Sequence, residues 1–100
     1  MAFEVRFKDE SLGTLERDAR YNAGYSEAIC KAFRKRMQQI RAATDERDFY
    51  ALKSLRFEKL KGPRSQQYSM RLNDQWRLIL ELEGEGPNKK LTIVGIEDYH

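Results

Sequence analysis

The sequence predicts an α+β fold in which two to three N-terminal helices pack on a small, mainly antiparallel sheet. Apolar residues recur at helical spacing in the first half, and from residue 68 onward they alternate with polar residues as in strands. Short loops separate the later segments, and consecutive strands joined by short loops pair antiparallel. The chain has 100 residues, the length of one domain, so we expect a single domain over residues 1–100.

The chain begins with a segment that is typical of a short strand, because apolar and polar side chains alternate over residues 2–8. Asp9 or Ser11 can then cap a helix, which we expect to end before the turn residues at 22–24.

A longer helix is predicted to begin at Ser26, whose side chain suits a helix N-cap. Its apolar residues form one stripe at helical period: Ile29, Ala32, Phe33, Met37 and Ile40. Its basic residues are predicted to form a solvated face: Lys31, Arg34, Lys35, Arg36 and Arg41. Thr44 or Asp45 can cap a short third helix that runs through residue 52.

The second half of the chain predicts three strands. Residues 68–72 alternate, Asn73-Asp74 is a turn sequence, and residues 76–82 continue as a second strand. After a loop over residues 83–88, residues 90–96 carry β-branched side chains suited to the centre of a sheet.

The composition excludes several classes of protein. Cys30 is the only cysteine, which excludes a disulfide scaffold and suits a reducing compartment. No apolar run approaches the roughly 18 residues of a membrane helix, and the first ten residues lack a signal-peptide pattern. One histidine and one cysteine cannot form a Cys/His zinc site, and no glycine-rich phosphate loop is present. We therefore expect a cytoplasmic protein without metal, cofactor or membrane partner.

The charge is unevenly distributed along the chain. The formal net charge is only +3, but residues 51–80 hold seven basic side chains against two acidic ones. Residues 81–100 hold five acidic side chains against two basic ones. A basic stretch with aromatic residues fits a polyanionic partner, although a solvated basic face would look the same.

Two arginines are predicted to lie close together at one edge of the sheet. The strand period places Arg71 on the same face as Ser69, and Arg77 on the same face as Ile79. Paired arginines can hold a phosphate and stabilise the negative charge that develops during its transfer. The only histidine, His100, ends the chain, and imidazole is the side chain best suited to proton transfer at neutral pH.

Three segments together resemble the HigB-type toxins of the RelE/ParE superfamily, which are bacterial type II toxin–antitoxin proteins. These segments are residues 60–64, residues 67–78 and the closing Glu97-Asp98-Tyr99-His100. The resemblance covers about two-fifths of the chain and implies a RelE-like fold.

The resemblance implies a ribonuclease that cleaves messenger RNA, often in the ribosomal A site, without a metal. In that reaction the RNA 2′-hydroxyl attacks the adjacent phosphorus. The partners it implies are the ribosome and an antitoxin with a helix-turn-helix domain, and the toxin would reach operator DNA only through the antitoxin complex.

The resemblance also implies roles for individual residues. Glu58 and His100 would transfer protons, Arg71 and Arg77 would stabilise the charge on the phosphate, and Tyr99 would stack on or orient the nucleotide. The remaining implied positions are Lys61 and Arg64, which would grip the RNA backbone, and Asp98, which would support the terminal geometry.

Some relatives carry histidine where this chain has Glu58. Because a carboxylate beside Lys59, Lys61 and Arg64 favours its ionised form, we expect Glu58 to be the base and His100 the acid. Two alternatives stay open from the sequence: a gyrase-poisoning toxin of the ParE type, and a non-catalytic RNA- or protein-binding module with the same fold.

Overall fold

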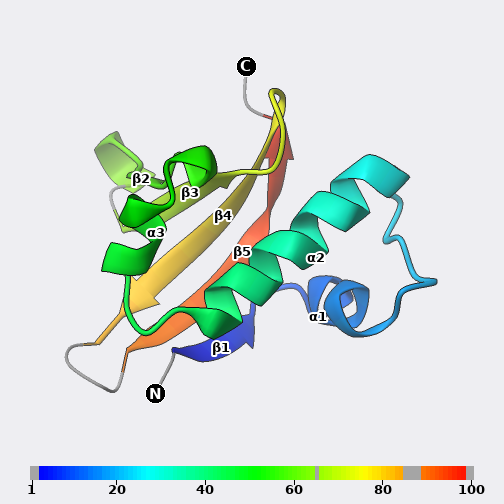
Figure 1. Ribbon diagram of the computed structural model, residues 1–100, viewed down its shortest axis with the longest axis horizontal. Coiled ribbons are helices and arrows are strands. Elements are labelled where there is room, and N and C mark those ends of the chain that lie inside the picture. Colours follow the sequence, from blue (N-terminus) through cyan, green and yellow to red (C-terminus); the bar gives the residue numbers. More distant parts are fainter. Residues whose placement is uncertain (1–2, 65, 85–88, 99–100) are drawn as a thin grey trace.

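The computed structural model describes residues 3–64, 66–84 and 89–98. The described chain forms a five-stranded sheet in the order β1-β5-β4-β3-β2, with helices α1 and α2 on one face (Figure 1). The strands are β1 (Glu4–Phe7), β2 (Glu58–Lys59), β3 (Gln67–Arg71), β4 (Trp76–Glu83) and β5 (Lys90–Asp98).

The sheet is mixed but mostly antiparallel, which confirms the predicted fold class. Strands β2, β3, β4 and β5 pair antiparallel in sequence order, whereas β1 pairs parallel to β5. The parallel pairing is possible because the helices intervene between the two strands in the sequence. Strand β2 was not predicted, because two residues are too few to show an alternating pattern.

Two of the predicted helix starts are confirmed. Helix α1 (Glu10–Arg17) is capped by Asp9, whose carboxylate accepts a hydrogen bond from the Ser11 N–H at 3.0 Å. Helix α2 (Glu27–Ala42) is capped by Ser26, whose hydroxyl oxygen accepts from the Ile29 N–H at 3.3 Å. Each cap satisfies a backbone donor that the helix itself leaves unpaired.

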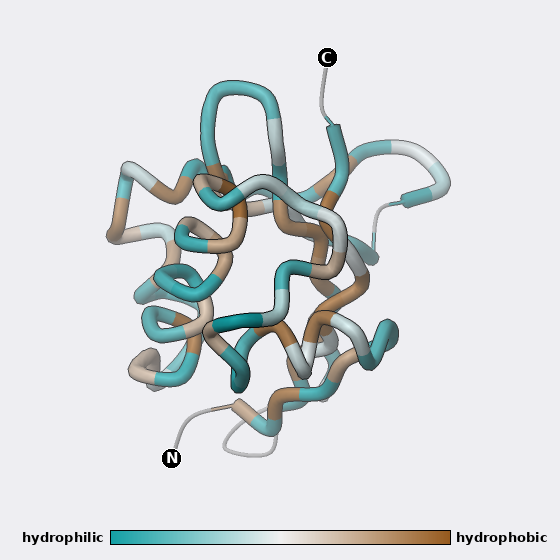
Figure 2. Tube along the Cα trace, turned by 90° about the vertical axis from the view of Figure 1, so that its right-hand side faces the viewer, coloured by the Kyte–Doolittle hydropathy of each residue, from teal (hydrophilic) through white to brown (hydrophobic). Residues whose placement is uncertain are grey.

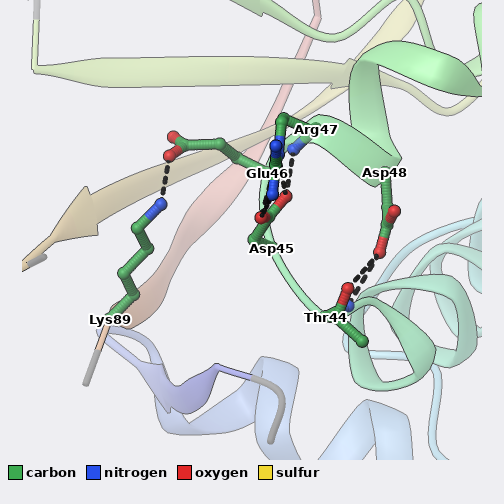
Figure 3. A network of polar contacts seen from close by, with 6 residues as sticks. All are labelled: Thr44, Asp45, Glu46, Arg47, Asp48 and Lys89. Carbon is green, nitrogen blue, oxygen red and sulfur yellow. Dashed lines mark hydrogen bonds and ion pairs between the residues drawn. The ribbon is translucent and has the colours of Figure 1, made fainter. Parts of the chain in front are cut away.

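The N-cap of the third helix is Glu46, one residue after the predicted Asp45. Helix α3 (Arg47–Ala51) begins after Glu46, which makes no side-chain cap hydrogen bond. Thr44 and Asp45 instead form local turns (Figure 3). Thr44 donates through its N–H and its hydroxyl to Asp48, while Asp45 accepts from the N–H of the first helical residue at 2.8 Å. These side chains shape the approach to the helix, so the helix starts later than the sequence indicates.

The core lies between the helices and the inner face of the sheet. Phe33 and Met37 of α2 are fully buried against inward-facing residues of β4 such as Leu78 and Leu80. In Figure 2 hydrophobic residues gather in the middle of the trace, and hydrophilic residues follow the outer loops. Among the described residues no helix has both the length and the apolar character needed to span a membrane.

Candidate active site

The outer face of the sheet, opposite α1 and α2, brings the two candidate arginines together. The β3–β4 register places Arg71 directly opposite Arg77, and the β4–β5 register places Glu97 opposite Arg77. The proximity of the two arginines therefore agrees with the alternation of the sequence. Like charges on directly opposite sheet positions destabilise a fold, but here each arginine is paired with a carboxylate, Arg71 with Asp74 and Arg77 with Glu58.

A cavity of about 200 Å³ lies beside this pair. It is lined by three arginines and two turn residues: Arg56, Arg71, Asn73, Asp74 and Arg77. Arg71 forms an ion pair with Asp74 across the β3–β4 turn. A cavity lined by three arginines is suited to an anion with several acceptor oxygens, such as a phosphate.

Glu58 lies next to this cavity and contacts one of its arginines. Its carboxylate accepts a hydrogen bond from the Arg77 guanidinium at 3.0 Å. The Arg77 side chain is only 13% exposed, whereas that of Glu58 is 54% exposed. The arginine is thus held in the sheet surface, while the carboxylate stays accessible to a bound molecule. The structure brings together three of the predicted catalytic residues: Glu58, Arg71 and Arg77.

A second cavity, of about 410 Å³, lies beside Glu58. It is lined by Glu58, Lys59, Leu60, Lys61 and Arg64. Lys61 and Arg64, the two residues of this loop that are predicted to bind the RNA backbone, therefore line the same cavity as Glu58. This cavity thus holds three basic side chains and one carboxylate.

Arg64 has a structural partner that the sequence did not reveal. Its two terminal nitrogens donate to the two carboxylate oxygens of Glu97 at 3.0 and 2.7 Å, and its Nε donates to Gln67 at 3.0 Å. The strand registers place Gln67 and Glu97 on either side of the row that holds Ser69 and Ile79. The Arg64 side chain therefore crosses this row, which accounts for the full burial of Ser69 and Ile79 on the face opposite the helices.

The end of β5 lies beside the β3–β4 hairpin. Asp98 pairs with Trp76 in the β4–β5 register, and its carboxylate accepts from the Gln75 side chain at 3.0 Å. Strand β5 therefore ends at the same end of the sheet where Arg71 and Arg77 lie. The predicted site residues Tyr99 and His100 lie outside the described residues.

Arg36 contradicts the prediction of a solvated basic face on the long helix. It is 7% exposed, and its Nε donates to the backbone carbonyl of Arg71 at 2.7 Å. Burial, and secondarily the charge of Arg71, lowers the pKa of Arg36. The sequence held a signal for this burial, because Arg36 is three residues after Phe33 and four before Ile40, within the apolar stripe. Arg36 supports the candidate site from beneath the sheet.

Comparisons with known proteins agree with this fold. Residues 5–96 match the family model described as the RelE-like toxin of type II toxin-antitoxin system HigB. The chain belongs to this family, and it is a toxin of the RelE/HigB type of type II toxin–antitoxin systems. A search of the curated proteins finds no match.

Several solved structures have a similar fold over almost the full length of this chain. The YoeB/ParE toxin from Agrobacterium tumefaciens is 15% identical, with a TM-score of 0.60 over 98% of this chain and 100% of that one. The YoeB-YefM complex from Staphylococcus aureus matches at 18% identity, with a TM-score of 0.58 over 100% of this chain and 99% of that one. The YoeB dimer from the same organism matches at 17% identity and a TM-score of 0.53, with the same coverage of both chains. At these identities the likeness shows the fold alone.

Proposed function

We propose that this protein is a cytoplasmic endoribonuclease that cleaves messenger RNA on the ribosome. The observation that carries the proposal is the ion pair between Glu58 and Arg77 beside a cavity lined by three arginines. This arrangement puts a proton acceptor next to groups that bind phosphate, as cleavage of RNA at a phosphodiester requires.

The proposed reaction uses the RNA itself as the nucleophile. Glu58 takes the proton of the 2′-hydroxyl, whose oxygen then attacks the adjacent phosphorus. The bond from phosphorus to the 5′-oxygen of the next nucleotide breaks, and His100 donates a proton to that oxygen. The products are a cyclic phosphate and a free 5′-hydroxyl, so atoms and protons balance without a metal ion.

Arg71 and Arg77 are proposed to stabilise the negative charge that builds on the phosphate oxygens in the transition state. Their arrangement supports this role, because guanidinium groups on directly opposite sheet positions can both reach one phosphate. Tyr99 is proposed to orient the nucleotide at the site of cleavage, and Asp98 to support the terminal residues.

Lys61 and Arg64 are proposed to bind the RNA backbone in the second cavity, which they line together with Glu58. Arg64 is paired with Glu97, but both side chains remain partly exposed, at 41% and 39%. The Arg64 guanidinium is therefore accessible to RNA. RNA phosphates would therefore compete with Glu97 for the Arg64 guanidinium.

The proposed protein partner is an antitoxin with a helix-turn-helix domain. The YoeB-YefM structure supports the idea that a toxin of this fold assembles with a second protein. Binding to operator DNA would take place through the antitoxin in that complex.

Primer extension on messenger RNA during translation in vitro tests the proposal. We expect the purified protein to produce discrete cleavage sites, and Arg77→Ala and His100→Ala to lower the cleavage rate by about 100-fold or more. Arg47→Ala is the matched control, because this arginine is exposed and lies near Lys89, at the opposite end of β5 from Arg77. Unchanged cleavage in both site variants would contradict the roles. Intact messenger RNA together with inhibited DNA supercoiling would favour the gyrase alternative.

A further inference from the structure

A third arginine, Arg56, lines the same cavity as Arg71 and Arg77. It belongs to none of the three sequence segments that indicated the family. It precedes β2 and follows the short 3-10 helix at Lys53–Leu55. Its placement therefore rests on the fold of the segment between α3 and β2.

The backbone holds Arg56 in an unusual conformation. Its φ is 47° and its ψ 48°, in the left-handed region that residues with a Cβ rarely adopt. Its N–H donates to the Lys53 carbonyl at 3.1 Å, and its neighbours Leu55 and Phe57 are buried in the core. The flanking residues thus fix this conformation, and the Arg56 side chain is left outside the core.

The cavity arginines differ in their partners. Arg71 is paired with Asp74, and Arg77 with Glu58. Within residues 3–64, 66–84 and 89–98, Arg56 forms no ion pair and no side-chain hydrogen bond. A guanidinium beside the cavity whose five donors are not engaged by a carboxylate can bind an incoming anion without displacing an internal partner.

We propose that Arg56 is a further RNA-binding residue, which contacts a backbone phosphate in the cavity that Arg71 and Arg77 line. The inference rests on the proposed function, since it assigns the anion to the RNA substrate. It adds that this contact needs no exchange of an internal ion pair, because Arg56 alone of the three arginines has no such pair among the described residues. Arg56 contributes affinity rather than proton transfer.

Arg56→Gly is a sharp test, because glycine adopts a positive φ without a steric cost. The substitution removes the guanidinium and relieves the backbone at once. We therefore expect the variant to fold with an unchanged or higher denaturation midpoint, so that weaker binding is not a consequence of unfolding. Arg47→Ala removes the same charge from an exposed position at the other end of the sheet and serves as the control.

The probe is a single-stranded RNA oligonucleotide with 2′-O-methyl groups throughout, which cannot be cleaved by 2′-hydroxyl attack. Its affinity is measured by fluorescence anisotropy, with and without ribosomes, between about 50 and 200 mM salt. The slope of log affinity against log salt is about −0.7 for each phosphate contact with a single strand, so losing one contact reduces the effect of this fourfold salt change by about 2.6-fold. We expect that reduction for Arg56→Gly, together with weaker binding at the lowest salt concentration, and wild-type behaviour for Arg47→Ala.

Wild-type affinity and salt slope in Arg56→Gly would overturn the inference and leave the proposed function intact, provided that Arg77→Ala still loses affinity. An equal change in Arg47→Ala would also overturn it, since the effect would then come from net charge alone. A wild-type protein that binds no oligonucleotide under either condition would contradict the proposed function itself.

Discussion

Arg36→Met removes a buried positive charge beneath the candidate site while keeping a side chain of similar length. The Arg36 guanidinium donates to the Arg71 carbonyl at 2.7 Å and to Gln39 at 3.2 Å. Among the described residues it has no carboxylate partner, so its charge adds directly to the positive potential of the cavity. The substitution should therefore weaken binding of a negatively charged substrate.

Coulomb attraction between Arg36 and the bound phosphate sets the size of this effect. With a separation of about 10 Å between the Arg36 charge and a phosphate beside the Arg71 side chain, and an effective dielectric constant of about 20, the attraction is about 1.7 kcal/mol. This corresponds to about a 15-fold change in affinity. In Arg36→Met two contributions to the free energy of unfolding oppose each other. The net change in this free energy should therefore be smaller than when one partner of a buried ion pair is removed. The lost hydrogen bonds cost about 1.5–3 kcal/mol each, and removal of an unpaired buried charge recovers several kcal/mol.

The assay is single-turnover cleavage of messenger RNA on programmed ribosomes, measured at increasing toxin concentration. For Arg36→Met we expect the half-saturating concentration to rise about 15-fold while the maximal rate changes little, because only substrate binding is affected. Arg36→Lys keeps the charge and should stay close to wild type. An unchanged half-saturating concentration in Arg36→Met, or an equal loss in Arg36→Lys, would refute the electrostatic reasoning.

Two further predictions concern stability and are measured by urea denaturation. The buried Ser69 hydroxyl has no hydrogen-bond partner among the described residues, so Ser69→Ala should raise the free energy of unfolding by roughly 1 kcal/mol; a loss of similar size would contradict this. The hydroxyl and N–H of Ser11 lower the pKa of Asp9 in the folded protein, so this cap stabilises α1 above about pH 4 and loses its effect as the pH falls. Asp9→Ala should therefore cost about 1 kcal/mol at pH 7 and much less at pH 3, whereas an equal cost at both pH values would exclude this linkage.

Local rules predicted those parts of the fold that depend on neighbours in the sequence. The strand period placed Arg71 and Arg77 on one edge, and side-chain capping located the starts of α1 at Asp9 and α2 at Ser26. Each of these features depends on residues fewer than ten positions apart, and their geometry is almost independent of the rest of the chain.

The remaining features depend on contacts between distant segments. The ion pair between Arg64 and Glu97 joins residues 33 positions apart, and the hydrogen bond from Arg36 to Arg71 joins residues 35 apart. The alternation of the strands does not specify either partner, because both arginines reach across by long flexible side chains. The left-handed conformation of Arg56 is likewise set by the packing of Leu55 and Phe57. Glycine and asparagine are the residues that usually indicate such a conformation in a sequence, and this position has neither.

The most direct test of the proposed chemistry is the structure of the ends that cleavage leaves on messenger RNA. We predict a 2′,3′-cyclic phosphate on the upstream fragment and a free 5′-hydroxyl on the downstream one. The 5′-hydroxyl is identified by direct labelling with polynucleotide kinase without prior dephosphorylation. A 5′-phosphate on the downstream fragment would contradict proton transfer by Glu58 and His100 to and from the RNA itself.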